Sequence, residues 1–232
     1  MYTVGRVYTY VRLRSRKCRL TKAEREAAIE DAAYRLLRER GYAATSMLTI
    51  AKSANASNET LYRWYGDKAG LVKVLVERNA ATVKSKLQAA IQSDADALST
   101  LSEIAPVLLS MLLGERAVCL NRAAAADTSG ELGAAIAAEG RDAVFPLINR
   151  IMQAAIDQGA LNAPSAGWAG EAFINLLVGD LQVRRVNRSM LEPDEQTIAK
   201  RARDAMLTFC QLCTGDGRES TAVDLSCRLS CA

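Results

Sequence analysis

A short polar and aromatic segment, SNETLYRWYGDK at residues 57–68, carries side chains suited to binding another molecule. It holds three large rings, Tyr62, Trp64 and Tyr65, in a chain that is only 5% aromatic. Successive residues of an α-helix point about 100° apart, so a short helix cannot bury all three rings against one core. At least one ring must therefore face outward, where a partner can contact it.

Helical spacing divides this segment into two faces. Leu61, Trp64 and Tyr65 fall on one face, and we expect them to pack on neighbouring helices. The opposite face would present Asn58, Glu59, Tyr62 and Arg63. Amide and guanidinium groups can bind base edges in the major groove of DNA, and the backbone amides of a helix N-terminus favour phosphate. The segment is thus typical of a DNA-recognition helix, although Tyr62 could instead cover the edge of a preceding helix.

The charge of the chain is unevenly distributed. Residues 1–68 hold 14 basic and 7 acidic residues, a balance of +7, whereas the rest of the chain brings the total down to +4. A basic front part favours contact with a polyanion such as DNA, although a solvated basic arm would give the same balance.

The composition argues against several other function classes. The chain has no histidine, which removes Ser–His and Cys–His catalysis and most catalytic metal sites. We can assemble no nucleophile with a base and no paired carboxylates, so we expect neither an enzyme nor a cofactor. No stretch approaches the roughly 18 apolar residues of a membrane span, and the N-terminus lacks the apolar region of a secretory signal. We therefore expect a cytoplasmic protein without membrane contact.

Four of the six cysteines lie near the C-terminus with C-x2-C and C-x3-C spacing: Cys210, Cys213, Cys227 and Cys231. This spacing resembles a zinc ribbon, and it leaves a zinc-stabilised helical interaction protein as the alternative to a DNA-binding regulator. The first two cysteines also fit an apolar helical pattern with Met206 and Phe209, which favours buried, reduced thiols.

The first predicted helix spans residues 22–40. Thr21 and Glu24 have the spacing of a capping box, in which each side chain accepts a hydrogen bond from the other's backbone amide. Gly41 stands where a helix C-terminus favours a left-handed residue.

Three further helices are predicted after this one. Ser46 can cap a short helix over residues 47–54, and the turn at residues 55–57, Asn-Ala-Ser, separates it from a helix over residues 58–65. A long fourth helix would run over residues 68–93. Two helices joined by a three-residue turn, with a supporting helix in front, predict a helix-turn-helix DNA-binding unit.

These residues resemble the DNA-binding domain of TetR-family transcriptional regulators. The resemblance covers about residues 25–75 and is carried by a dense pattern: Gly41-Tyr42-x-x-Thr45-Ser46-Met47-x-x-Ile50-Ala51-x-x-Ala54-Asn55-Ala56-Ser57-x-x-Thr60-Leu61-Tyr62-x-x-Tyr65-x-x-Lys68-x-x-Leu71. It implies an all-α homodimer whose N-terminal helix-turn-helix domain binds a double-stranded DNA operator. The C-terminal helical domain would bind a small-molecule inducer and dimerise. Three positions depart from the family pattern: Asn55 replaces the usual turn glycine, Glu59 places a carboxylate near the DNA backbone, and Leu48 stands where a basic or polar residue is common.

The resemblance also implies DNA contacts from six side chains: Ser46, Asn58, Thr60, Tyr62, Arg63 and Lys68. Asn58 and Arg63 would reach bases or backbone, and the other four would contact phosphates. Glu59 could accept a hydrogen bond from a cytosine amino group, or it could complement the positive end of the helix dipole.

From residue 97 onward the pattern predicts helices over residues 97–113, 116–127, 131–158 and 168–187, and a last helix from Pro193 to about residue 212. The Asp-x-Gly-x-Leu motif at residues 157–161 also resembles one C-terminal subtype of the TetR family. The expected organisation is a basic disordered arm (1–20), a DNA-binding domain (21–67), a ligand-binding and dimerisation domain (68–212) and a disordered tail (213–232).

Six residues are candidates to line a ligand pocket among the middle helices, although each could be plain core: Met111, Cys119, Phe145, Met152, Trp168 and Phe173. Few charged residues fall on inner faces there, which favours an apolar or neutral ligand over a metal ion. The last two predicted helices carry apolar stripes that could form either a dimer interface or an intramolecular core. We therefore predict a repressor that such a ligand releases from its operator, although the sequence does not distinguish a repressor from an activator.

Overall fold

The computed structural model of the chain describes residues 21–93 and 95–214. These residues are mostly helical and form no strand, which confirms the predicted all-α fold class. The predicted arm at residues 1–20 and the predicted tail beyond residue 214 lie outside the described residues.

The first four helices agree closely with the sequence prediction. They are α1 (Lys22–Arg40), α2 (Met47–Ser53), α3 (Asn58–Tyr65) and α4 (Lys68–Gln92). The remaining elements are α5 (Ala97–Leu113), α6 (Glu115–Ala125), α7 (Glu131–Ile136), the π-turn η1 (Ala137–Arg141), α8 (Asp142–Asp157), α9 (Ala166–Val178), α10 (Leu181–Val186) and α11 (Glu195–Thr214).

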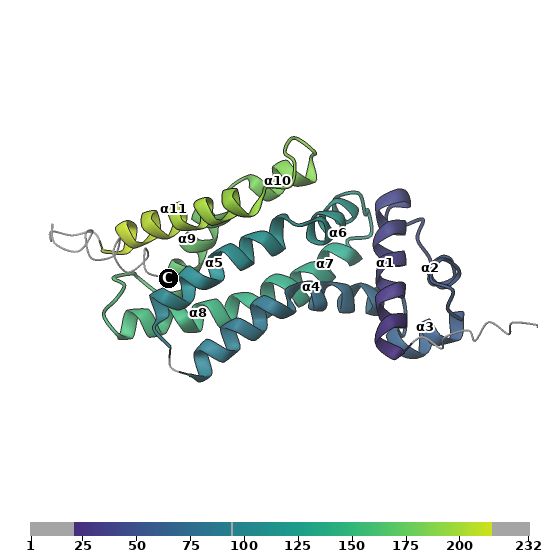
Figure 1. Cartoon of the computed structure of the whole chain (residues 1–232), viewed down its shortest axis with the longest axis horizontal. Helices are drawn as coiled ribbons and strands as arrows, with labels where there is room; N and C mark the ends of the chain where they lie inside the picture. The colour runs from purple at the N-terminus through teal and green to yellow at the C-terminus, as the bar shows by residue number, and fades with distance from the viewer. Residues whose placement is uncertain (1–20, 94, 215–232) are drawn as a thin grey trace, which may run out of the picture.

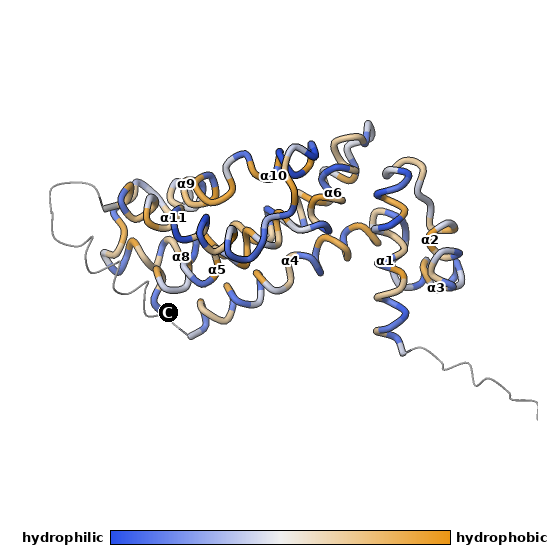
Figure 2. Tube along the Cα trace, turned by 45° about the horizontal axis from the view of Figure 1, so that its top comes forward, coloured by the Kyte–Doolittle hydropathy of each residue, from blue (hydrophilic) through white to orange (hydrophobic). Residues whose placement is uncertain are grey.

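Helices α1–α3 form one end of an elongated molecule, and α4 runs from them along the other helices (Figure 1). One apolar cluster joins α1–α3 to the first half of α4 and also includes residues of α6 and α7. A second cluster lies between the second half of α4 and helices α5, α8, α9 and α11. Apolar residues accordingly recur along the length of α4 (Figure 2), which belongs to both clusters.

Side-chain caps set the ends of the first helices. The hydroxyl of Thr21 accepts the backbone amide of Glu24, whose carboxylate accepts the amide of Thr21 at 2.7 Å, as predicted. Ser46 forms a second capping box with Thr49 at the start of α2. The turn between α2 and α3 contains Asn55 with φ +51, and asparagine tolerates this left-handed conformation better than most residues with a Cβ.

Helix α4 begins in close contact with the end of α3. A Cβ atom placed on Gly70 would lie 2.0 Å from the backbone oxygen of Tyr65, the last residue of α3. Only glycine therefore allows the two helices to approach this closely without a backbone shift.

Two predicted long helices are interrupted in the structure. The helix expected over residues 131–158 consists of α7, η1 and α8, with the π-turn just before Pro146, which cannot donate a backbone hydrogen bond to the Asp142 carbonyl. The helix expected over residues 168–187 divides at Gly179, where φ is +50, into α9 and α10. The last helix begins at Glu195 rather than at Pro193.

The apolar stripes proposed for dimerisation mostly pack inside the chain. Phe173 of α9 and Phe209 of α11 are fully buried with their ring centroids 5.7 Å apart, and Met206 is 2% exposed. The outward side of α11 carries Leu207 and Leu212 instead, which are 41% and 51% exposed. Most residues of the stripes therefore form intramolecular core, although Val183 is 60% exposed.

Among the described residues, no single helix is both long and apolar enough to cross a membrane. The pair α5 and α6 meets that criterion only when the two are taken together across a 50° bend. Taken together, more than half of the residues of the two helices belong to, or pack against, the two apolar clusters.

Candidate DNA-binding surface and ligand cavity

The outward face of α3 carries the side chains that the sequence analysis assigned to it. Asn58, Glu59 and Arg63 are exposed, and the ring of Tyr62 is 50% exposed. Leu61 is fully buried, while Trp64 and Tyr65 are half-buried against the same cluster. Helical spacing thus places an amide, a phenol and a guanidinium on one accessible surface.

The polar groups beside this face are held by local hydrogen bonds. The hydroxyl of Ser57 accepts the backbone amide of Thr60 at 3.1 Å, and the two hydroxyls are 2.8 Å apart. Ser46 caps α2, so its hydroxyl is fixed at the helix N-terminus. Both helices therefore present capped N-termini, where amide dipoles favour an anion such as phosphate.

Lys68, at the start of α4, is already engaged within the chain. Its ammonium donates to the backbone oxygen of Tyr42 at 3.0 Å and lies 3.8 Å from the centroid of the Tyr42 ring. A phosphate contact by Lys68 would have to add to, or replace, this interaction.

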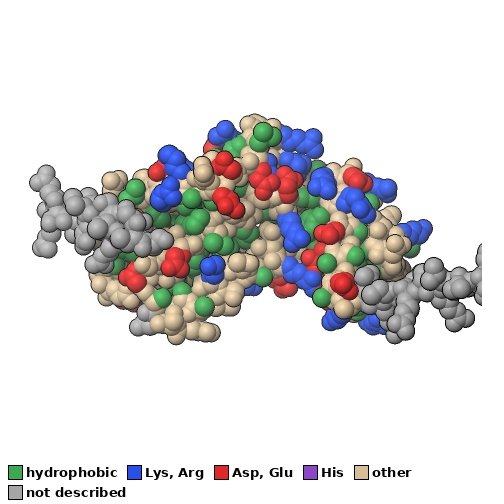
Figure 3. All heavy atoms as spheres, in the orientation of Figure 1, with side chains coloured by type: hydrophobic (Ala, Val, Ile, Leu, Met, Phe, Trp, Pro, Cys, Tyr) green, Lys and Arg blue, Asp and Glu red, His purple; other side chains and the backbone are tan. Residues whose placement is uncertain are grey.

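Charged side chains of both signs lie over this end of the molecule. Figure 3 shows Lys and Arg side chains interspersed with Asp and Glu side chains over the part formed by α1–α3. Arg35 of α1 donates to the hydroxyl of Ser53 in α2, which helps to hold these two helices together. Residues 21–68 carry eight basic and seven acidic side chains, so most of the positive balance of the front part comes from residues 1–20, outside the described residues.

Polar contacts attach α4 firmly to α1. Arg78 of α4 forms ion pairs with Glu26, at 2.7 Å, and with Glu30, whose side chain is only 7% exposed. Burial raises the pKa of Glu30 above its ordinary value, whereas the hydrogen bond from Arg78 lowers the pKa of Glu26. One turn earlier, the hydroxyl of Tyr34 donates to the Leu75 backbone oxygen at 3.3 Å. A movement of α4 would therefore carry α1 with it.

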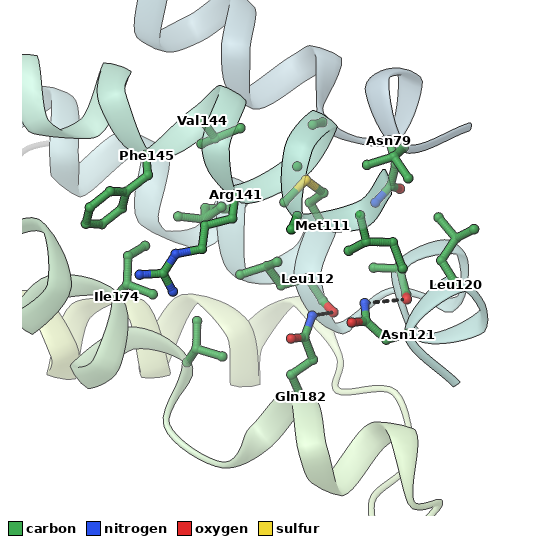
Figure 4. Close-up of a pocket in the computed structure, with 18 of the residues that line it drawn as sticks. Asn79, Met111, Leu112, Leu120, Asn121, Arg141, Val144, Phe145, Ile174 and Gln182 are labelled. Carbon is green, nitrogen blue, oxygen red and sulfur yellow. Dashed lines mark hydrogen bonds between the residues drawn. The ribbon is translucent and has the colours of Figure 1, made fainter. Parts of the chain in front are cut away.

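A cavity of about 410 Å³ lies between helices α4–α10 and the π-turn η1, within the range of small-molecule sites. Its walls are mainly apolar, and Figure 4 shows several of the side chains that line it. Of the six predicted lining residues, Met111 and Phe145 line this cavity. The other four lie elsewhere: Met152 and Phe173 are fully buried core, Cys119 is buried beside Tyr34, and Trp168 is 40% exposed on α9.

The polar groups of the cavity were missed in the sequence analysis. They are three carboxamides and one guanidinium: Asn79, Asn121, Gln182 and Arg141. Asn121 and Gln182 each donate to a backbone oxygen, of Ala117 at 2.9 Å and of Leu112 at 3.1 Å. No sequence signal marks these amides, because they come from three separate helices.

The buried cysteines of α11 show no metal-site geometry. Cys210 and Cys213 lie in the apolar cluster of the C-terminal helices, and burial raises the pKa of the Cys210 thiol to about 11. The described part of the chain contains no group of three or more residues that could hold a metal ion. Cys227 and Cys231 lie outside that part, so the structure does not test the four-cysteine pattern.

Two family profiles match this chain. "Bacterial regulatory proteins, tetR family" matches residues 29–75, and "AefR-like transcriptional repressor, C-terminal domain" matches residues 99–212. Together they cover more than half of the sequence. They support neither the zinc-stabilised alternative nor an enzyme.

Individual relatives agree with these profiles. The uncharacterized HTH-type transcriptional regulator YvkB of Bacillus subtilis (strain 168) is 37% identical over 84 residues, which are 36% of this chain and 43% of that protein. The chain thus matches less than half of that relative's length.

Solved structures match over most of the chain. A TetR transcriptional regulator from Agrobacterium tumefaciens is 29% identical, with 82% of this chain and 94% of that chain covered and a TM-score of 0.62. The fold is also shared by SmeT, described as the repressor of the Stenotrophomonas maltophilia multidrug efflux pump SmeDEF. The SmeT–triclosan complex is 18% identical, with 83% and 93% of the two chains covered and a TM-score of 0.68. Regulators of this family bind operator DNA and small molecules and are typically dimers. From its two matched regions and its helical architecture, the chain belongs to the TetR family of transcriptional regulators.

Proposed function

We propose that this protein is a repressor that a small, largely apolar ligand releases from its operator. The observation that carries the proposal is the double role of α4. Its residues Val76, Asn79 and Ala80 line the cavity, while Arg78, in the same turn, is paired with Glu26 and Glu30 of α1. A ligand that displaces α4 would therefore move the DNA-binding helices.

A second connection supports the same coupling. The hydroxyl of Tyr42, in the loop after α1, donates to the carboxylate of Glu131 at 3.2 Å. Glu131 begins α7, and Gly133 and Ile136 of that helix line the cavity. Tyr42 also receives the hydrogen bond from Lys68, so this loop joins the cavity wall to the start of α4.

For DNA binding, we propose that α3 enters the major groove with Asn58 and Arg63 toward bases or backbone. Tyr62 and Thr60 would contact phosphates, and Ser46 and Lys68 would contact phosphates from the starts of α2 and α4. The exposure of Asn58, Tyr62 and Arg63 and the capped helix N-termini support this placement.

One helix-turn-helix unit reads few base pairs, so we propose that the protein acts as a homodimer. Two recognition helices about 34–36 Å apart, or a multiple of this, would reach successive major grooves. The outward side of α11, with Leu207 and Leu212, is the surface that we assign to the contact between the two copies. For a ligand to release the protein from DNA, it must bind more tightly to the state whose recognition helices are wrongly spaced for DNA than to the DNA-binding state. The difference is a coupling free energy that is typically ~1–3 kcal/mol.

The test begins with capture of the genomic DNA that the purified protein binds. Affinity for the captured operator is then measured by fluorescence anisotropy for the wild type, Arg63→Ala and Tyr62→Ala. Loss of a base contact at Arg63 should cost ~1–3 kcal/mol. Arg150→Ala is the matched control, because Arg150 is an exposed arginine of α8 at a distance in sequence and fold from α3. Equal operator affinity in all four proteins would refute the proposed recognition surface.

A further inference from the structure

The cavity carries a charge of only one sign. Arg141 is the single charged residue among the described residues that line it, and no carboxylate lines it. The other polar groups are the carboxamides of Asn79, Asn121 and Gln182. A cationic ligand would therefore meet a like charge and no counter-ion, whereas an anionic group would meet a guanidinium.

The π-turn explains how Arg141 comes to face the cavity. Gly133, Ala137, Arg141 and Phe145 all line it and follow one another at intervals of four residues. In a continuous α-helix this stripe would drift by about 40° at each step, because four residues exceed one turn. The wider π-turn at Ala137–Arg141 offsets part of this drift and keeps the stripe on one side.

Arg141 stands at the mouth of the cavity with its charge incompletely matched. Its guanidinium carbon lies 5.1 Å from the centroid of the Phe145 ring, and Nη2 is 3.7 Å from Oε1 of Glu171 on α9. The two charged side chains are 65% and 61% exposed, so this long ion pair contributes little and can open. Figure 4 shows the guanidinium turned toward Phe145 and Ile174, away from Asn121 and Gln182.

The carboxamides offer a second polar region. Asn121 and Gln182 use a side-chain N–H to reach backbone oxygens, which leaves their own oxygens as acceptors. The side chain of Asn79 forms no hydrogen bond with the described residues and also borders the cavity. A ligand hydroxyl or N–H group could bind here while an apolar body fills the space between the two polar regions.

We propose that the ligand is a largely apolar molecule with one acidic oxygen group, which Arg141 binds at the cavity mouth in exchange for Glu171. This inference rests on the proposed function and specifies the chemical class of its ligand. It differs from the sequence-based expectation of an apolar or neutral ligand, because Arg141 was not among the residues predicted to line the cavity.

A matched pair of fluorescent dyes tests the proposal. 1-Anilinonaphthalene-8-sulfonate is an acidic apolar molecule, and N-phenyl-1-naphthylamine is the same molecule without the sulfonate. We expect the acidic dye to bind the wild type more tightly. Arg141→Gln should weaken the acidic dye ~5-fold, the upper end for an exposed charge pair, and leave the neutral dye unchanged. Glu171→Gln should have the opposite effect and tighten the acidic dye, because it removes the competing carboxylate.

Two further variants separate this proposal from the proposed function. Arg150→Gln removes an exposed arginine that does not line the cavity and should change neither dye. Gly133→Leu should weaken the binding of both dyes. Gly133 lines the cavity and a Cβ on it would meet no atom within 4 Å, so the leucine side chain has room to extend and would fill the cavity. Circular dichroism confirms that each variant is folded.

The outcomes distinguish the two ideas. Suppose that both dyes bind the wild type and that neither binds Gly133→Leu; the cavity is then a ligand site. If, in addition, Arg141→Gln weakens the acidic dye no more than Arg150→Gln does, the proposal of an acidic ligand is wrong. If Gly133→Leu leaves both dyes bound, or neither dye binds the wild type, the cavity is not the site and both proposals fail. Displacement of the acidic dye by dodecanoate or by 2-naphthoate then identifies the apolar body as a chain or a ring system. Displacement by neutral 1-dodecanol but by neither acid would overturn the acidic class.

Discussion

The junction between α3 and α4 makes the sharpest prediction about how the DNA-binding surface is held. In Gly70→Ala, the new Cβ would lie 2.0 Å from the Tyr65 backbone oxygen, although real Cβ atoms essentially never come within 3.0 Å of another atom. The carbonyl must therefore move by about 1 Å or more, and it cannot rotate away as a flexible side chain would. It also accepts the backbone amide of Asp67 at 2.9 Å, so the movement weakens the connection between the two helices. We expect a loss of ~1–3 kcal/mol in the free energy of unfolding.

The matched control is Gly133→Ala, in the interior of the helical segment α7. Its Cβ would meet no atom within 4 Å, so alanine should stabilise the protein by ~0.5–1 kcal/mol through its better helix propensity. The free energy of unfolding, measured in urea by circular dichroism, should thus fall in one variant and rise in the other, and the two values should differ by ~1.5–4 kcal/mol. Gly70→Ala should also weaken operator binding, because Tyr65 ends the recognition helix. Wild-type stability together with wild-type operator affinity in Gly70→Ala would show that the close approach does not position α3.

Three other predictions concern single residues. Asn55→Val should lower the free energy of unfolding by ~1–2 kcal/mol because φ is +51 there, whereas Asn55→Gly should not, and unfolding curves of the pair check this. Arg185→Met should lower the free energy of unfolding by ~2–4 kcal/mol, because this 5%-exposed arginine donates to two backbone oxygens as well as to Glu115. Glu115→Ala removes only a mostly exposed partner, so it should lower the free energy of unfolding by less than ~1 kcal/mol in the same assay. Burial raises the pKa values of Tyr42 and Tyr65 to about 12. Because the unfolded chain releases these phenol protons first, the two tyrosines should contribute fully to the free energy of unfolding below about pH 10 and lose this contribution as the pH rises toward 12. Absorbance at 295 nm and alkaline unfolding curves measure this. Ionisation of both rings at the pH of free tyrosine would contradict the prediction.

The interpretation of the C-terminal helices shows where sequence reasoning reached its limit. The residues chosen as pocket lining were large and apolar, and four of the six pack elsewhere, because the same side chains suit a closed core and a cavity wall equally well. The helix predicted over residues 131–158 missed the π-turn, because Gly133, Ala137, Arg141 and Phe145 share no property that marks them as one face in the sequence. Pro146 is the sequence signal that could have indicated an interruption, because a proline inside a helix cannot donate the backbone hydrogen bond to the residue four positions earlier.

The sequence by itself determined the helix-turn-helix unit, because caps, turns and helical periodicity depend on residues within a few positions of one another. Thr21 with Glu24, Ser46, Asn55 and the inward spacing of Leu61 each act locally, and each has the predicted role in the structure. Only the tertiary structure decided which side chains border the cavity. It also decided that α4 both lines the cavity and forms ion pairs with α1. Asn79, Asn121, Arg141 and Gln182 come from four elements, and their proximity follows from how those helices pack, which no local pattern encodes.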